Sequence, residues 1–161
     1  MLTYHRVIQD GISEYGNLHM RKSVLSISRG GERLAIAHGT KPLMPITFKP
    51  DRTFTLSDRT KVAFQVLESQ TRKFREIEAD IFRAYLCPGI SKLVFIVPTN
   101  QDGENVIRIT EIIQDGLEHL GVRKDLHLFL VLTIPRTVRR ATDVLFYLNN
   151  VRVNRQIFGA A

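Results

Sequence analysis

The chain has 161 residues, of which 43% are hydrophobic and 24% charged, and these values predict a single globular domain over residues 1–161. Its one cysteine, Cys87, excludes an internal disulfide and a zinc site of several thiolates, and every apolar run is too short to span a bilayer. Lysine and arginine outnumber aspartate and glutamate by 23 to 16, which favours a polyanionic partner; the N-terminal residues lack the layout of a secretion signal, which favours a cytoplasmic protein.

The N-terminal part of the chain predicts a helix followed by a hairpin. Apolar residues recur at helical intervals over Thr3–Tyr15. Met20–Ser28 and Arg33–Ala37 flank a glycine-containing turn, so we expect an antiparallel pair of strands. Lys22 and Arg29 on this pair are candidates for contact with DNA phosphates; a solvated strand edge is the alternative role for each.

A second hairpin is predicted next. Thr53–Leu56 and Lys61–Leu67 are rich in β-branched and aromatic residues, and the polar residues between them are typical of a turn. A loop of two or four residues would place Leu56 opposite Lys61, and Asp51 opposite Val66. An odd loop or a bulge would break this register.

Polar side chains flank this hairpin where they could form a metal site. With an even loop, Asp51, Glu68 and Gln70 project from the same face of the sheet. Two carboxylates on neighbouring strands suit magnesium or manganese, which prefer oxygen ligands. The alternative is that Asp51 belongs to a Pro-Asp turn and that Glu68 is an exposed acid at the end of a strand.

The C-terminal half predicts alternating helices and buried strands. Thr71–Leu86 has an apolar stripe, and Leu93–Val97 is a continuous apolar run. Apolar spacing from Val106 to Leu120 predicts another helix, Leu126–Ile134 another buried strand, and Pro135 the start of a last helix. This alternation implies parallel pairing of the two strands through a right-handed crossover.

Basic residues of this half add candidate DNA contacts. Lys73 lies near the expected strand-to-helix junction, where it could bring a cation to the site; pairing with a neighbouring glutamate in solvent is the alternative. Arg139 and Arg140 belong to an arginine-rich stretch that could bind a DNA backbone. A surface that only increases solubility is the alternative for that stretch.

The acidic pattern resembles the signature of the PD-(D/E)XK nuclease superfamily, which includes restriction endonucleases and Holliday junction resolvases. Pro50-Asp51 is followed by Glu68-Ser69-Gln70 at the end of an apolar strand, and the resemblance extends over roughly Met1 to Thr99. It implies an α/β fold with an αβββαβ core, a central mixed sheet flanked by helices, and here a C-terminal αβα extension. Gln70 takes the place of the usual motif lysine. Several members donate a glutamate from the first helix, which makes Glu14 a possible further ligand.

The implied function is that of a magnesium-dependent endonuclease acting on DNA, with a homodimer expected by analogy. Asp51 and Glu68 would hold magnesium or manganese, the metal would activate a water molecule, and Gln70 would orient that water. Glutamine carries no positive charge, so we expect slower cleavage than with a lysine. A catalytically inactive DNA-binding or assembly module on the same scaffold is the alternative, and an α/β interaction protein without a nucleic acid partner is a third reading.

Overall fold

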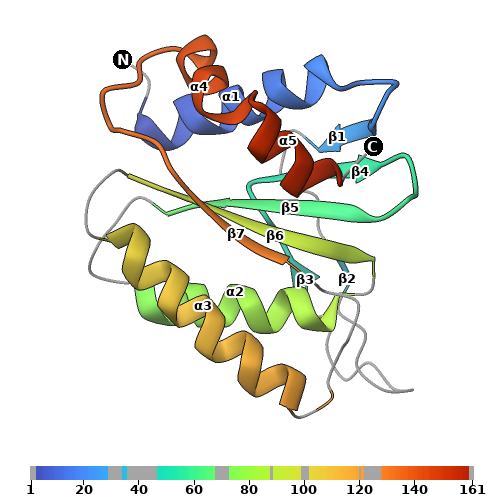
Figure 1. Cartoon of the computed structure of the whole chain (residues 1–161), viewed down its shortest axis with the longest axis vertical. Helices are drawn as coiled ribbons and strands as arrows, with labels where there is room; N and C mark the ends of the chain where they lie inside the picture. Colours follow the sequence, from blue (N-terminus) through green and yellow to red (C-terminus); the bar gives the residue numbers. More distant parts are fainter. Residues whose placement is uncertain are drawn as a thin grey trace.

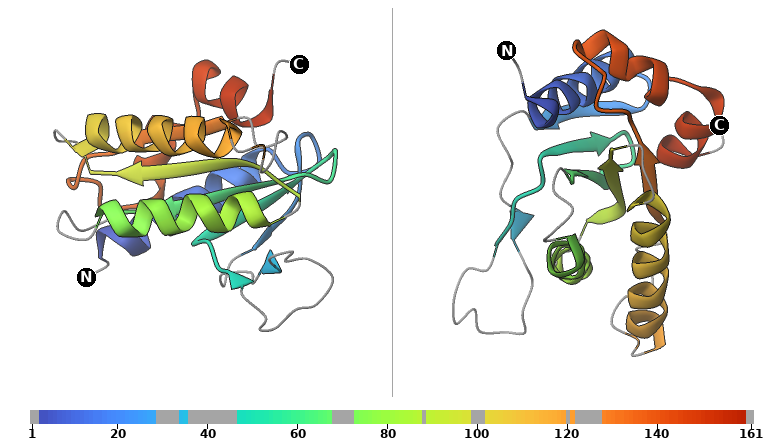
Figure 2. Two further views of the ribbon diagram at one scale, coloured as in Figure 1. Left: turned by 90° about the horizontal axis from the view of Figure 1, so that it is seen from below. Right: turned by 90° about the vertical axis from the view of Figure 1, so that its left-hand side faces the viewer.

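The computed structural model describes residues 3–28, 34–35, 47–67, 73–87, 89–98, 102–119, 121 and 128–159. These residues form an α/β structure in which helices cover both faces of a mixed sheet (Figure 1). Helices α1, α4 and α5 lie on one face, and α2 and α3 lie side by side on the other (Figure 2). None of the described helices is both long and apolar enough to cross a membrane.

The elements alternate along the chain much as the apolar patterns predict. The three long helices and the buried strands are all present. In chain order the elements are α1 (Tyr4–Leu18), β1 (Val24–Ser28), β2 (Leu34–Ala35), β3 (Thr47–Phe48), β4 (Arg52–Leu56), β5 (Lys61–Val66), α2 (Lys73–Leu86), β6 (Ile90–Val97), α3 (Asp102–His119), β7 (Leu128–Thr133), α4 (Ala141–Leu148) and α5 (Val151–Phe158).

The main sheet of the described residues has the strand order β1-β4-β5-β6-β7. The pairs β1–β4 and β4–β5 are antiparallel, whereas β5–β6 and β6–β7 are parallel, which confirms the predicted parallel pairing. The predicted hairpin of Met20–Ser28 with Arg33–Ala37 is wrong, because β1 pairs with β4 and β2 pairs with β3. Val24 of β1 is fully buried in the core beneath α1, and this burial, rather than the turn predicted from the sequence, decides its partner.

The turn between β4 and β5 differs from the prediction by one residue. Thr55, and not Leu56, lies opposite Lys61. Leu56 N–H donates to the Thr60 carbonyl at 2.8 Å, and Arg59 N–H donates to the Leu56 carbonyl at 2.8 Å. Arg59 has a φ of 71°, so its left-handed backbone completes a three-residue loop of the type-I-turn-plus-bulge kind. The even loop that would place Asp51 opposite Val66 is therefore not formed.

Two apolar layers lie on the two sides of the sheet. The layer under α1, α4 and α5 contains buried side chains of alternate strand residues, among them Phe54, Phe64 and Ile96. The layer under α2 and α3 contains their neighbours, among them Phe95. Helices α1 and α4 approach closely at Gly11, where an added Cβ atom would lie 2.4 Å from the Val144 Cβ.

The C-terminal extension has two helices instead of one. The stretch after Pro135 is not yet helical, and α4 begins at Ala141. Asp143 Oδ2 accepts the backbone N–H of Arg140 at 3.1 Å, which satisfies a free donor at the start of α4. Asn150 then caps α5, since its Oδ1 accepts the Val153 N–H at 3.0 Å. The first cap marks the start of α4, and the second separates α5 from α4. The extension is therefore αβαα instead of αβα.

Candidate functional site

A polar cavity of about 440 Å³ lies where β5 ends. It is bordered by the first turn of α1, the start of β4, the end of β5 and one face of α2, through the residues His5, Asp51, Gln65, Val66, Leu67, Arg75, Glu76, Ala79, Asp80 and Arg83. Strand β5 runs parallel to β6, so this is the carboxyl end of the parallel part of the sheet. Ligands of open α/β sheets bind at that end, and we therefore take this cavity as the candidate site.

The carboxylate of Asp51 is held by donors from two elements. Oδ1 accepts from His5 Nε2 at 2.7 Å and from Gln9 Nε2 at 2.9 Å. Oδ2 accepts from the Val66 backbone N–H at 2.8 Å. Burial raises the pKa of Asp51, but the hydrogen bonds and the charge of His5 outweigh burial and hold that pKa below its usual value. The side chain is 16% exposed, so an ionised carboxylate faces the cavity.

The backbone of Asp51 lies beside Phe64 and Gln65. Its N–H is 3.0 Å from the Phe64 carbonyl and 3.2 Å from Gln65 Oε1. The carboxylate nevertheless reaches further along β5, since its Oδ2 accepts the Val66 N–H. The predicted proximity of Asp51 to the end of β5 is thus present, although the predicted register is not.

Asp80 of α2 brings a second carboxyl group to the cavity. Only 8% of the residue is exposed, and this burial raises its pKa to about 7. Arg83 Nη1, 3.6 Å from Asp80 Oδ1, and a hydrogen bond with Gln65 oppose the rise, whereas the charges of Asp51 and Glu76 add to it. Two carboxyl groups lining one cavity therefore have pKa values that are displaced in opposite directions, which is typical of acid–base pairs.

Four predicted site residues lie wholly or in part outside what the structure describes. Glu68 and Gln70 follow the cavity residue Leu67 in the sequence, but both lie outside the described residues, as does Arg29. Helix α2 begins at Lys73, and of Lys73 the structure describes the backbone alone. The roles of these residues stay predictions.

The other predicted residues lie away from the Asp51 cavity. Glu14 lines a different cavity, together with Arg139 and Arg140. The structure therefore does not bring Glu14 and Asp51 into one cavity. Lys22 is exposed in the turn between α1 and β1.

Three residues of the site were missed by sequence reasoning. His5 and Gln9 are four positions apart, so they share one face of α1. Asp80 is an acidic residue, yet it lies three positions after buried Ile77 and four before buried Ala84. Its spacing from these two apolar residues places Asp80 on the buried face of α2, and this spacing is the one sequence signal for its burial.

Comparison of the chain with protein-family models, with curated proteins and with solved structures gives no match.

Proposed function

We propose that the chain is a metal-dependent endodeoxyribonuclease with Asp51 as a metal ligand. The observation that carries this proposal is the Asp51 carboxylate, fixed by His5, Gln9 and Val66 on the wall of an open cavity at the end of β5. The main sheet adds support: apart from β2 and β3, which pair in a separate small sheet, the chain order is α1, the antiparallel strands β1, β4 and β5, then α2 and the parallel strand β6. Asp51 precedes the second of these strands, and Glu68 follows the third.

The donor chemistry of the cavity suits a hard cation. An ionised carboxylate has about four acceptor positions, and the described donors use three of those of Asp51, which leaves one on Oδ2. Among the described residues, no group of three histidine, cysteine, aspartate or glutamate side chains is placed to hold a metal ion. The proposed site therefore needs Glu68, the residue that follows cavity-lining Leu67.

When bound, magnesium supplies Lewis-acid chemistry: it makes a water molecule more acidic and offsets charge on the reacting phosphate. The protein's own contribution is orientation and proton exchange. His5 and Gln9 fix the direction of the Asp51 carboxylate, as the hydrogen bonds around metal ligands generally do. Asp80, with a pKa of about 7, can accept or release a proton near neutral pH. Arg75 and Arg83 border the same cavity and attract phosphate.

Cleavage of supercoiled and branched DNA in magnesium tests the proposal. Asp51→Asn keeps the size of the side chain but removes its charge, and we expect the cleavage rate to fall at least about 100-fold, in line with removal of a key electrostatic group. Asp115→Asn on α3 removes one carboxylate outside the cavity and is the matched control, with an expected rate close to that of the wild type. Equal rates for Asp51→Asn and the wild type would reject the assignment.

A catalytically inactive DNA-binding module is the second candidate function. It is favoured by the lack of a three-residue metal group among the described residues and by the glutamine at position 70. Calorimetry with manganese separates the two candidates. The nuclease proposal predicts saturable binding that Asp51→Asn weakens. DNA retention without manganese binding would support the inactive module.

A further inference from the structure

A larger cavity, of about 650 Å³, lies between α1 and the start of α4. Four arginines line it, together with two acidic residues of α1: Arg6, Arg52, Arg139, Arg140, Asp10 and Glu14. Residues 6, 10 and 14 are spaced four apart, so they share one face of α1. The positive charges exceed the negative ones, and the cavity therefore favours an anion.

The arginines are held in two different ways. Arg52 is almost fully buried at the base, where its Nε donates to Ser13 Oγ at 2.8 Å and its Nη2 lies 3.8 Å from Asp10 Oδ1. Arg6 Nε lies 3.4 Å from the same carboxylate oxygen. Arg139 and Arg140 are exposed, and neither guanidinium forms an ion pair with a described carboxylate. Two arginines are thus paired with Asp10, whereas the charges of the other two are available to a ligand.

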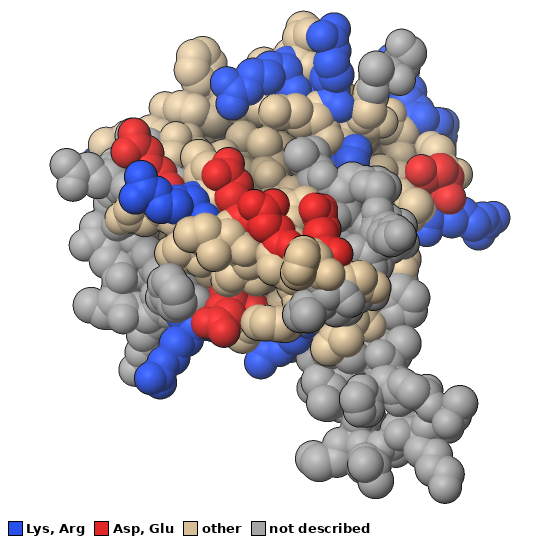
Figure 3. Space-filling view, turned by 60° about the horizontal axis from the view of Figure 1, so that its bottom comes forward, with Lys and Arg blue, Asp and Glu red and all other residues tan. Residues whose placement is uncertain are grey.

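Charge is also unequally distributed between the two sides of the molecule. The sequence from 136 to 158 has five arginines and one aspartate, whereas α3 has five acidic residues and one arginine. Acidic side chains gather on the face that α2 and α3 cover (Figure 3). A polyanion is therefore attracted to the α1–α4 side and repelled from the α3 side.

Arg52 links this cavity to the Asp51 site. Its Nη1 donates to the Asp51 carbonyl oxygen at 2.7 Å, and the two residues are consecutive at the start of β4. On α1, His5 borders the Asp51 cavity, and the next residue, Arg6, borders the arginine cavity. The two cavities therefore lie on either side of the first turn of α1, where one extended DNA strand could reach both.

We infer that the arginine cavity binds a backbone phosphate of the DNA that reaches Asp51. This inference rests on the proposed function and adds a second phosphate contact to it. Guanidinium groups bind phosphate oxygens through paired N–H donors, and exposed arginines can adjust to the path of the strand. Asp10 pairs with both Arg6 and Arg52, so Arg139 and Arg140 supply the contacts that vary with the ligand.

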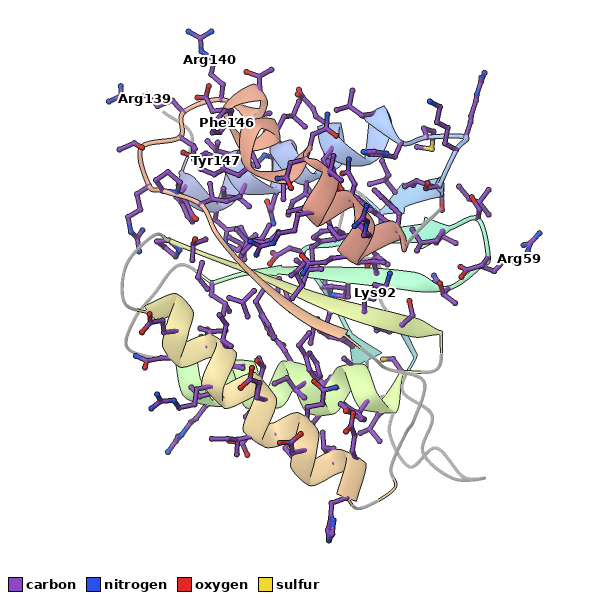
Figure 4. All side chains as sticks on the ribbon, viewed as in Figure 1. Arg59, Lys92, Arg139, Arg140, Phe146 and Tyr147 are labelled. Carbon is purple, nitrogen blue, oxygen red and sulfur yellow. The ribbon has the colours of Figure 1, made fainter. Side chains whose placement is uncertain are left out.

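Fluorescence anisotropy with a labelled DNA duplex tests the inference in EDTA, where metal-dependent cleavage is blocked. Arg139→Gln and Arg140→Gln each remove one exposed charge. Arg59→Gln is the matched control, because Arg59 is exposed and lies at the right of the view in Figure 4, far from Arg139 and Arg140 at the upper left. We expect each cavity variant to weaken binding by roughly 3- to 10-fold, and to reduce the slope of log affinity against log salt by about 1, with the control unchanged.

Inorganic phosphate provides a second arm of the experiment. If the cavity takes free phosphate rather than a DNA backbone, phosphate at low concentration will protect the wild type against thermal unfolding, while both arginine variants bind the duplex as tightly as Arg59→Gln does. That pattern overturns the inference, as does failure of the wild type to bind the duplex.

The inference and the proposed function fail in different ways. DNA binding that depends on Arg139 and Arg140, without magnesium-dependent cleavage, would reject the nuclease and keep the phosphate site. Cleavage that depends on Asp51, with the same KM for DNA in both arginine variants, would reject the phosphate site and keep the nuclease.

Discussion

His5 Nε2 lies 2.7 Å from Asp51 Oδ1 and joins the first turn of α1 to the start of β4, 46 positions later in the chain. Gln9, one turn further along α1, donates to the same oxygen. The side chain of the acid on which the proposed function depends is therefore oriented mainly by a helix from the beginning of the chain.

His5→Ala should impair the site by releasing the Asp51 carboxylate. We expect about a 10- to 100-fold loss in manganese affinity and in magnesium-dependent cleavage, the range typical when a partner of a metal ligand is removed. Calorimetry and cleavage rates measure the two effects. His119→Ala, at the exposed end of α3, is the control. A variant at position 5 with wild-type manganese affinity would show that the contact has no such role.

Asp80 should make the protein less stable as the pH rises towards neutrality. Its pKa is about 7 in the folded state, against 3.8 for an unperturbed aspartate, so between these values the folded state binds a proton that the unfolded state has released. The free energy of unfolding therefore decreases from about pH 4 to pH 7 and then levels off. Each pKa unit corresponds to about 1.4 kcal/mol.

Asp80→Asn removes this ionisation, so the variant should gain stability relative to the wild type between pH 5 and pH 8. Urea unfolding at the two pH values measures the difference. Asp115→Asn controls for the loss of a carboxylate elsewhere on the molecule. If the difference between Asp80→Asn and the wild type is the same at both pH values, Asp80 does not have a raised pKa.

Gly11→Ala should destabilise the contact between α1 and α4. The added methyl group would lie 2.4 Å from the Val144 Cβ, and separating two packed helices costs about 1–3 kcal/mol. Urea unfolding should show a smaller loss when Val144→Ala is already present, since the two sites are in contact. Gly116→Ala on α3 meets nothing within 4 Å and should instead stabilise the protein by up to about 1 kcal/mol.

Arg59→Gly should stabilise the β4–β5 hairpin. Arg59 has a φ of 71°, a conformation that costs a non-glycine residue about 1–2 kcal/mol and that glycine adopts freely. After allowing for the greater freedom of glycine in the unfolded chain, we expect a gain of roughly 0.5–1 kcal/mol in the free energy of unfolding. Ser57→Gly in the same loop should lower the free energy of unfolding. A loss at position 59 as well would contradict the three-residue loop.

Sequence patterns alone predicted the principal helices and strands of the described chain. Val7, Ile8, Ile12 and Tyr15 recur at helical spacing and are all buried in α1, because one face of a helix must cover the sheet. The apolar run of β6 likewise predicted a central parallel strand. Such patterns depend on side chains a few positions apart, and all the residues of one pattern belong to the same helix or strand.

The tertiary structure decided the partner of β1, the register of the hairpin and the contacts around Asp51. One residue more or less in the loop shifts every pair between β4 and β5, and Arg59 in a left-handed conformation is not a residue that turn preferences indicate. The contact between His5 and Asp51 and the burial of Asp80 arise only when separate elements pack against one another. Local spacing does not predict those contacts, because they depend on which elements pack together and on how far each is shifted along its axis.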